Sequence, residues 1–177
     1  MIRAALLCLG LAASLPASAR APSEVPVGGI LREATMQGLN GPPSQLAQYR
    51  GRPLLINVWA SWCGPCVAEM ASLERLAWRE DRPPFSLIGI STDDYPDRAL
   101  AFLNRSNATI RHFIDHDLEM ETMLGASKIP LTILVDANGR VLDKIYGARE
   151  WDSPESLQLL ARTFGRLPQG RAAAPNR

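Results

Sequence analysis

Cys63 and Cys66 lie between a run typical of a buried strand and the start of a helix. Leu54 to Trp59 is nearly all apolar, the pattern of a strand covered on both faces. Pro65 stands where the first turn of a helix accepts proline, and apolar residues then recur at helical spacing to about Arg79. A strand that leads into a helix through two cysteines restricts the possible folds, because the motif must lie at a helix N-terminus.

This position predicts redox chemistry at the two cysteines. The free N–H groups and the positive end of a helix favour an anion, so Cys63 should hold a thiolate more easily than a free cysteine. Cys66, one turn into the helix, is placed to close a disulfide with it. We therefore expect Cys63 to attack the disulfide of a partner and Cys66 to resolve the mixed disulfide.

Other uses of a cysteine pair fit less well. A purely structural disulfide is disfavoured at a strand-to-helix junction. A zinc site normally takes four ligands, and the chain has no second cysteine pair. A c-type haem site needs His directly after Cys66, where Val67 stands.

The N-terminal segment has the pattern of a signal peptide. Arg3 precedes an apolar, uncharged run from Ala4 to Leu15, and Ala17-Ser18-Ala19 has the small residues that a signal peptidase accepts. We expect cleavage after Ala19, which also removes the third cysteine, Cys8, and places the chain in the periplasm. An uncleaved inner-membrane anchor is the alternative, although the run is shorter than the ~20 residues of a spanning helix.

Length and composition fit one exported domain. The 177 residues are 46% hydrophobic and 21% charged, with a formal net charge of +1. The chain has no basic run that would collect phosphates, so we expect no nucleic-acid partner. Residues 20–29 read as a linker or entry strand, residues 30–165 as the domain, and residues 166–177 as a disordered tail.

The pattern along the domain predicts a central mixed sheet flanked by helices, an α/β fold. Asn40-Gly41 indicates an N-terminal hairpin, and Ser44 is the expected cap of a short helix to Tyr49. The further elements expected are strands at 85–91, 112–114, 131–135 and 140–146, and helices at 97–105, 118–124 and 153–164.

The segment from Asn57 to Met70, with Trp62-Cys63-Gly64-Pro65-Cys66 at its centre, resembles the active site of the TlpA/ResA-like branch of thioredoxins. The resemblance continues through Ile129-Pro130 and the Asn138-Gly139 turn and covers roughly Ile30 to Phe164. It implies a thioredoxin-like fold with an N-terminal hairpin extension and the activity of a thiol:disulfide oxidoreductase.

The resemblance also implies a docking surface for target proteins. Pro130 would be the cis-proline that faces the disulfide, turning the Ile129 backbone toward an extended peptide. Trp62, Gly64 and Pro65 would complete this surface. The family often has Thr after the proline, whereas Leu131 follows here, a departure that concerns partner preference.

Two polar residues bear on the mechanism that the resemblance implies. Asn57 stands where ordinary thioredoxins have a buried acid, and Asn cannot titrate. Glu69 lies three residues after Cys66 on the same side of the helix, where the exported branch commonly has Glu. We expect Glu69 to be partly buried, with a raised pKa, and to accept the proton of Cys66. Trp59 is expected in the core, and Tyr95, Trp151 and Asp152 in loops and caps.

The residues between the cysteines favour a reductase. Pro65 offers neither charge nor hydrogen-bond donor to the thiolate. The Gly64-Pro65 pair matches that of thioredoxin, a reductant at about −270 mV, whereas DsbA lies at about −120 mV. A reductase in the periplasm needs an inner-membrane thiol donor, which the resemblance also implies. The expected targets are cysteines of apocytochrome c or of copper-site proteins of respiratory oxidases. We expect a monomer without a bound cofactor.

Three alternatives stay open at this level. The dithiol would instead oxidise folding proteins if its potential were high. Two thiolates with His112 or His116 would bind Cu(I), although related copper chaperones usually separate the cysteines by three residues, and the histidines lie near Asp115 and Asp117, where a surface position is natural. Peroxidase chemistry is disfavoured, because the Pro and Thr that precede a peroxidatic cysteine are absent.

Overall fold

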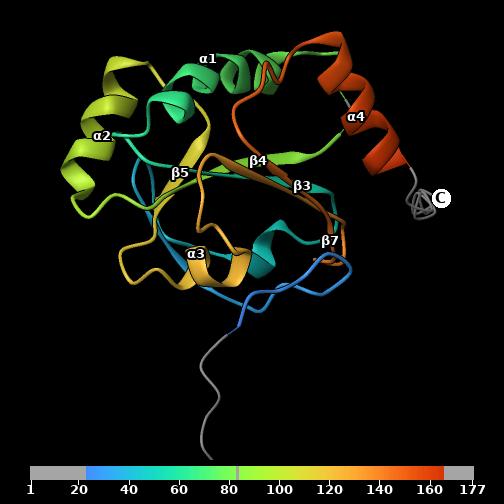
Figure 1. Cartoon of the computed structure of the whole chain (residues 1–177), viewed down its shortest axis with the longest axis horizontal. Helices are drawn as coiled ribbons and strands as arrows, with labels where there is room; N and C mark the ends of the chain where they lie inside the picture. The colour runs from blue at the N-terminus through green and yellow to red at the C-terminus, as the bar shows by residue number, and fades with distance from the viewer. Residues whose placement is uncertain (1–22, 83, 166–177) are drawn as a thin grey trace, which may run out of the picture.

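The computed structural model describes residues 23–82 and 84–165. The signal peptide expected at 1–19 and the tail expected at 166–177 lie outside the described residues. The elements within these ranges, shown in Figure 1, follow in the order β1 (Thr35–Gly38), β2 (Ser44–Gln45), the 3-10 helix η1 (Leu46–Tyr49), β3 (Leu54–Trp59), α1 (Gly64–Trp78), β4 (Ser86–Ser91), α2 (Pro96–Arg105), β5 (Arg111–Ile114), α3 (Glu119–Leu124), β6 (Leu131–Val135), β7 (Val141–Tyr146) and α4 (Pro154–Gly165).

The strands form one mixed sheet in the order β2-β1-β5-β4-β3-β6-β7. Strands β3, β4 and β5 are parallel, and β6 runs antiparallel to β3. The connections between the parallel strands contain α1 and α2, because parallel neighbours need a crossover, usually a helix. Strands β6 and β7 join directly as a hairpin. The predicted mixed sheet between helices is confirmed, and β3 at its interior leads into the cysteine motif.

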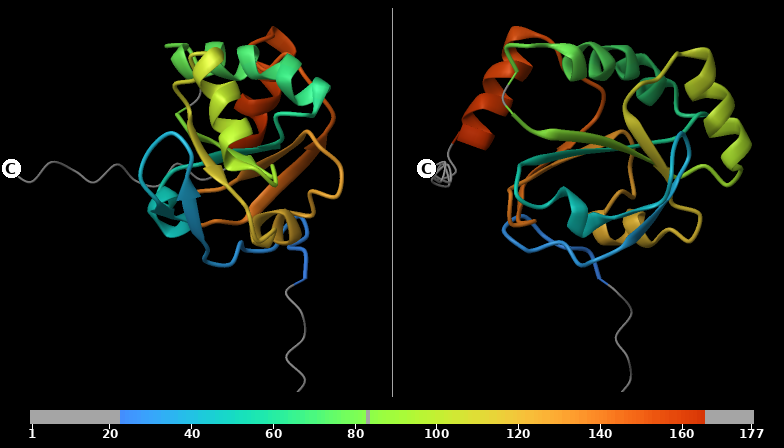
Figure 2. Two further views of the ribbon diagram at one scale, coloured as in Figure 1. Left: turned by 90° about the vertical axis from the view of Figure 1, so that its left-hand side faces the viewer. Right: turned by 180° about the vertical axis from the view of Figure 1, so that it is seen from behind.

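Helices cover both faces of the sheet. In Figure 1, α1, α2 and α4 lie on one face and α3 on the other, and the views of Figure 2 agree. Alternating side chains of β3 supply both layers: Leu55 and Trp59 pack beneath α1, α2 and α4, while Ile56 and Val58 face the layer of α3 and η1. Asn57 has the parity of Leu55 and Trp59, so it points toward α1.

The N-terminal hairpin is present, with one correction to its end. Strands β1 and β2 pair antiparallel, and Asn40 lies in their connection, where its side chain bonds the backbone of Ile110 and His112. Ser44 is not the cap of the short helix, as expected; it belongs to β2, and Gln45 caps η1 through a reciprocal bond with Gln48. Along residues 23–29, Val25 is buried and its N–H bonds Met123.

Helix ends follow the local signals in the sequence. Pro65 occupies the first turn of α1, and Ser153 accepts the N–H of Ser156 at the start of α4. Gly125 ends α3 with a positive φ of 73°, a conformation that costs glycine little. Within residues 23–82 and 84–165, the helices are all too short or too polar to traverse a lipid bilayer.

His112 lies in the core, where the sequence led us to expect a surface position. It belongs to β5, an inner strand, and its ring lies edge-on to Trp59 with the ring centroids 5.3 Å apart. On the neighbouring strand, Gly89 leaves room for the ring, because a Cβ there would come within 2.1 Å of His112 Nδ1. Burial lowers the pKa of His112 to about 3, and neither ring nitrogen has a hydrogen-bond partner.

Candidate active site

Cys63 and Cys66 form a disulfide at the N-terminus of α1, with their Cα atoms 5.3 Å apart. Cys63 is the N-cap residue, and its Sγ accepts the N–H of Cys66 at 3.3 Å. Cys63 keeps 6% of its surface exposed, whereas Cys66 is fully buried. A partner sulfur therefore has access to Cys63 before Cys66.

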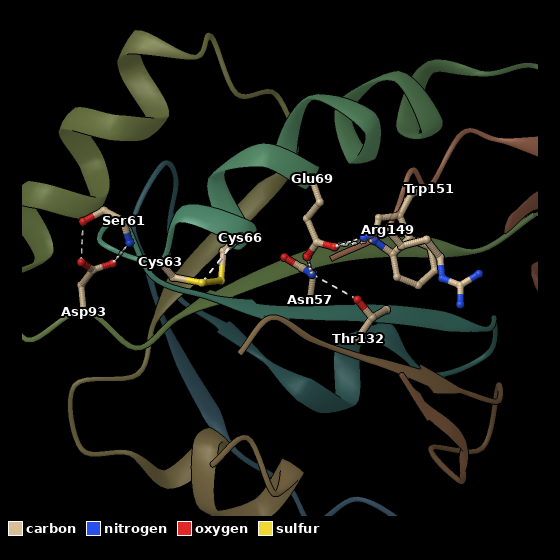
Figure 3. Close-up of a disulfide and its surroundings, with 9 residues drawn as sticks. All are labelled: Asn57, Ser61, Cys63, Cys66, Glu69, Asp93, Thr132, Arg149 and Trp151. Atoms are coloured by element: carbon tan, nitrogen blue, oxygen red, sulfur yellow. Dashed lines mark hydrogen bonds between the residues drawn. A yellow bond between two sulfur atoms is a disulfide. The ribbon is translucent and has the colours of Figure 1, made fainter. Parts of the chain in front are cut away.

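Asp93 holds the loop that leads from β3 to Cys63, a contact that sequence reasoning missed. Its carboxylate, buried just after β4, accepts the N–H of Ser61 at 2.8 Å and the hydroxyl of Ser61 at 2.6 Å (Figure 3). The hydroxyl of Ser91 donates to the same carboxylate at 2.7 Å. An Asp two residues after a buried parallel strand, beside the strand carrying the motif, was the available signal.

Glu69 lies buried on α1, one turn beyond Cys66, with 2% of its surface exposed. Asn57 Nδ2 donates to Oε1 at 2.8 Å, while the backbone N–H of Arg149 and the indole Nε1–H of Trp151 donate to Oε2, each at 3.1 Å. Figure 3 shows these donors converging on the carboxyl group from β3 and from the loop after β7.

Two opposing effects act on the Glu69 carboxyl. Burial disfavours the charged form and is the larger effect, so the pKa of Glu69 is raised above its ordinary value. The hydrogen bonds from Asn57, Trp151 and Arg149 favour the carboxylate and limit the rise. Glu69 was expected to be partly buried; the structure buries it almost completely, and this burial favours a raised pKa.

The polar partners of Glu69 reach across the sheet. Asn57 Nδ2 also donates to Thr132 Oγ1 at 3.1 Å, whereas its Oδ1 is buried without a partner. Trp151 lies in a loop, as expected, but it is fully buried and its N–H bonds Ser72 Oγ. Its contact with Glu69 was not foreseen, because a tryptophan between β7 and α4 gives no sign of the helix it will pack against.

Glu69 also borders a solvent-open pocket of about 210 Å³. Ala68, Ala148, Arg149 and Glu150 form the other walls. The small side chains of the two alanines leave this space open beside an otherwise buried carboxyl.

The residues expected to dock a target lie around the motif. The Ile129–Pro130 peptide bond is cis, and Pro130 accepts the N–H of Gly147. Ile129 packs against the apolar cluster that contains both cysteines. Trp62 is 67% exposed, and the space beside Gly64 is open.

Within the ranges that the structure describes, no three His, Cys, Asp or Glu side chains come together as metal ligands. His112, one of the nitrogen ligands considered for Cu(I), is enclosed by the core. His116 is exposed beside Asp117.

Comparison with known proteins agrees with this geometry. The family model described as Redoxin matches residues 20–160. The thiol:disulfide interchange protein DsbE of Vibrio cholerae is 33% identical over 131 residues, which cover 71% of this chain and 69% of the relative. The thiol-disulfide oxidoreductase ResA of Geobacillus thermodenitrificans is 27% identical over 123 residues, 70% of this chain and 71% of the relative.

Among solved structures, a DsbF homologue from Corynebacterium diphtheriae superposes with a TM-score of 0.65 at 24% identity, covering 78% of this chain and 87% of its own. This likeness shows the fold, which is thioredoxin-like as predicted. The family model matches most of the chain, and the names of both relatives describe thiol:disulfide exchange. The chain therefore belongs to the Redoxin family and is a thiol:disulfide oxidoreductase of the ResA and DsbE type.

Proposed function

We propose that this oxidoreductase works as a reductase of disulfides in target proteins outside the cytoplasm. The observation that carries the direction is the Gly64-Pro65 pair between the cysteines. Neither residue offers a charge or a side-chain donor to the Cys63 thiolate. Without such stabilisation of the thiolate, the reduced form is less stable relative to the disulfide. The pair therefore gives up its electrons more readily than an oxidase pair does.

The proposed cycle transfers two electrons to the target. The Cys63 thiolate attacks one sulfur of the target disulfide, forms a mixed disulfide and releases the other target sulfur as a thiolate. Cys66, once deprotonated, attacks Cys63 Sγ and releases the second target thiolate. The protein disulfide is then restored, the target is a dithiol, and an inner-membrane thiol donor must reduce the pair again.

Glu69 is the proposed proton acceptor for Cys66. The two residues lie one turn apart on α1, and burial raises the pKa of Glu69 toward the range of a useful base. The pocket beside Ala68 and Ala148 offers a route by which the proton can pass to solvent.

Target docking is assigned to the surface around the disulfide. The backbone of Ile129, next to the cis bond of Pro130, would pair with an extended segment of the target. Exposed Trp62, with Gly64 and Pro65, would lie against the same segment.

The compartment and the targets complete the proposal. The signal-peptide pattern of residues 1–19 supports export to the periplasm, with an inner-membrane anchor as the alternative. Cysteines of apocytochrome c or of copper-site proteins are the proposed targets, because these must be reduced before they bind haem or copper. The protein is proposed to act as a monomer.

The reduction potential of the Cys63–Cys66 pair tests the direction. It can be measured by Trp fluorescence or thiol alkylation of the chain without residues 1–19, across a series of dithiothreitol buffers. A value near that of thioredoxin, about −270 mV, is expected for a reductase. A value near that of DsbA, about −120 mV, would make the protein an oxidant of folding proteins and overturn the proposed direction.

A further inference from the structure

A solvent-open pocket of about 300 Å³ lies immediately beside the disulfide motif. Trp62, the neighbour of Cys63, forms one wall, and Ile129, the neighbour of Pro130, forms another. Exposed Leu118, just before α3, contributes further apolar surface. A target segment held at Ile129 with its sulfur at Cys63 must therefore pass along this pocket.

The charge on the pocket has one sign. Asp94, exposed after β4, and Glu121, half-buried on α3, are the ionisable residues in its wall, and both are acidic. Glu121 is also close enough to Asp115 that repulsion adds to burial in raising the Glu121 pKa. Lys128 lies on the same loop as Ile129 but does not line the pocket.

The combination of an exposed indole and two carboxylates suits one class of side chain. A lysine or arginine can lay its aliphatic stem, or the guanidinium plane, on the ring of Trp62 while its charge faces the acids. An acidic side chain at the same place would be repelled by Asp94 and Glu121 and would find no cationic side chain in the pocket wall.

We propose that this pocket selects target segments that carry a lysine or arginine one or two residues from the reactive cysteine. The selection rests on the proposed docking of an extended segment at Ile129, in which side chains on one face recur every second residue. Glu121 and Asp94 are its specificity-determining residues, and they act on the binding of the segment, before Cys63 attacks the target sulfur.

The test compares two peptides that differ only in charge. Each carries a single cysteine blocked by a neutral 2-thiopyridyl group and flanked on each side by two Lys or by two Glu residues, so that both positions named in the proposal carry the charge. The reduced protein attacks the peptide sulfur through Cys63 and releases pyridine-2-thione, which is followed by its absorbance. Because the leaving group is the same, the ratio of the two second-order rate constants reports docking and does not depend on the reduction potential.

We expect the Lys peptide to react about five- to tenfold faster at low ionic strength, with the ratio shrinking as salt is added. Glu121→Lys should bring the ratio to one or below. Glu119→Lys, the matched control, makes the same charge change at an exposed position on α3 outside the pocket and should leave most of the preference intact.

A ratio near one in the unaltered protein would overturn the proposal. So would an equal loss of preference in Glu119→Lys and Glu121→Lys, because the effect would then come from net charge and not from the pocket. A potential that assigned the protein to the oxidases would leave the expected ratio as it is, so the two proposals fail separately.

Discussion

The indole Nε1–H of Trp151 donates a 3.1 Å hydrogen bond to Oε2 of Glu69, joining residues 82 positions apart. Through this bond the loop before α4 becomes part of the redox site. Trp151 is also fully buried, so the donor cannot turn to solvent when the carboxyl changes its charge. The protonation state of Glu69 is thereby linked to a loop that is distant in sequence from both cysteines and lies outside α1.

Replacing Trp151 by Phe tests this link. Phe fills most of the same space but lacks the N–H, so the carboxylate loses a stabilising donor and the pKa of Glu69 should rise further. The pH at which target exchange accelerates should shift upward with it. Carbon NMR of labelled Glu side chains measures the pKa directly.

Trp78→Phe is the control for the loss of an indole N–H. Trp78 is exposed at the end of α1, and its Nε1 bonds Thr109. This variant should keep the pKa of Glu69 unchanged. An unaltered Glu69 pKa in Trp151→Phe would show that the bond has no influence on the carboxyl.

Glu69→Gln tests the role of the carboxyl as a proton acceptor. Gln retains the shape but cannot take a proton, so Cys66 should deprotonate less readily and resolution of a mixed disulfide should slow by roughly tenfold or more. The thiol pKa of Cys66 and the rate of the second exchange step are the quantities to measure. Glu80→Gln, at an exposed position past α1, should change neither. Unchanged thiol pKa values and exchange rate in Glu69→Gln would rule out the proposed role.

Local signals predicted the elements that carry the cysteines. Pro65 in the first turn, Gly125 after α3 and Ser153 before Pro154 act within a few residues of themselves, and the structure places helix ends at each. The apolar run of β3 likewise predicted a strand buried on both faces. These features depend on neighbours in the sequence, which is why they can be read without the fold.

The residues that were missed depend on contacts between distant segments. Trp151 gains its role only when the loop after β7 folds back onto α1, and Asp93 only when β4 lies beside β3. His112 was misplaced because nearby acids suggested a surface position, whereas its strand, β5, lies between β1 and β4 inside the sheet. Ser44 does not cap η1, because it pairs with Met36 in β2.

Asp93→Asn tests the contact that holds the loop before Cys63. The carboxylate accepts three hydrogen bonds from Ser61 and Ser91. In asparagine one of the two carboxylate oxygens becomes an NH₂ group, which cannot accept from the donors that face it. A buried donor left unsatisfied should lower the free energy of unfolding by about 1–3 kcal/mol, measured by urea denaturation. Asp94→Asn, at the exposed neighbouring position, should be nearly neutral for stability. Equal stability of the two variants would contradict the structural role of Asp93.

His112 should make the fold sensitive to mild acid. Burial holds the pKa of His112 at about 3 in the folded protein, against an ordinary value of 6.5. Since the unfolded chain binds the proton more readily, the stabilising contribution is complete above pH 6.5 and is lost progressively as pH falls toward 3. Between pH ~7 and pH ~5 this group alone should lower the free energy of unfolding by about 2 kcal/mol.

His112→Leu removes the titrating ring while keeping an apolar side chain beside Trp59 and Gly89. The measurement is the difference in urea unfolding free energy between the two pH values, which should shrink in this variant by about 2 kcal/mol relative to the unaltered protein. His116→Asn changes an exposed histidine and should leave the difference nearly as it was. If His112→Leu kept the full pH dependence, the charged form of His112 would have to be accommodated in the fold. The unpartnered ring nitrogens beside Trp59 argue against that accommodation, because a protonated imidazole carries two donors and the buried ring meets no acceptor for either.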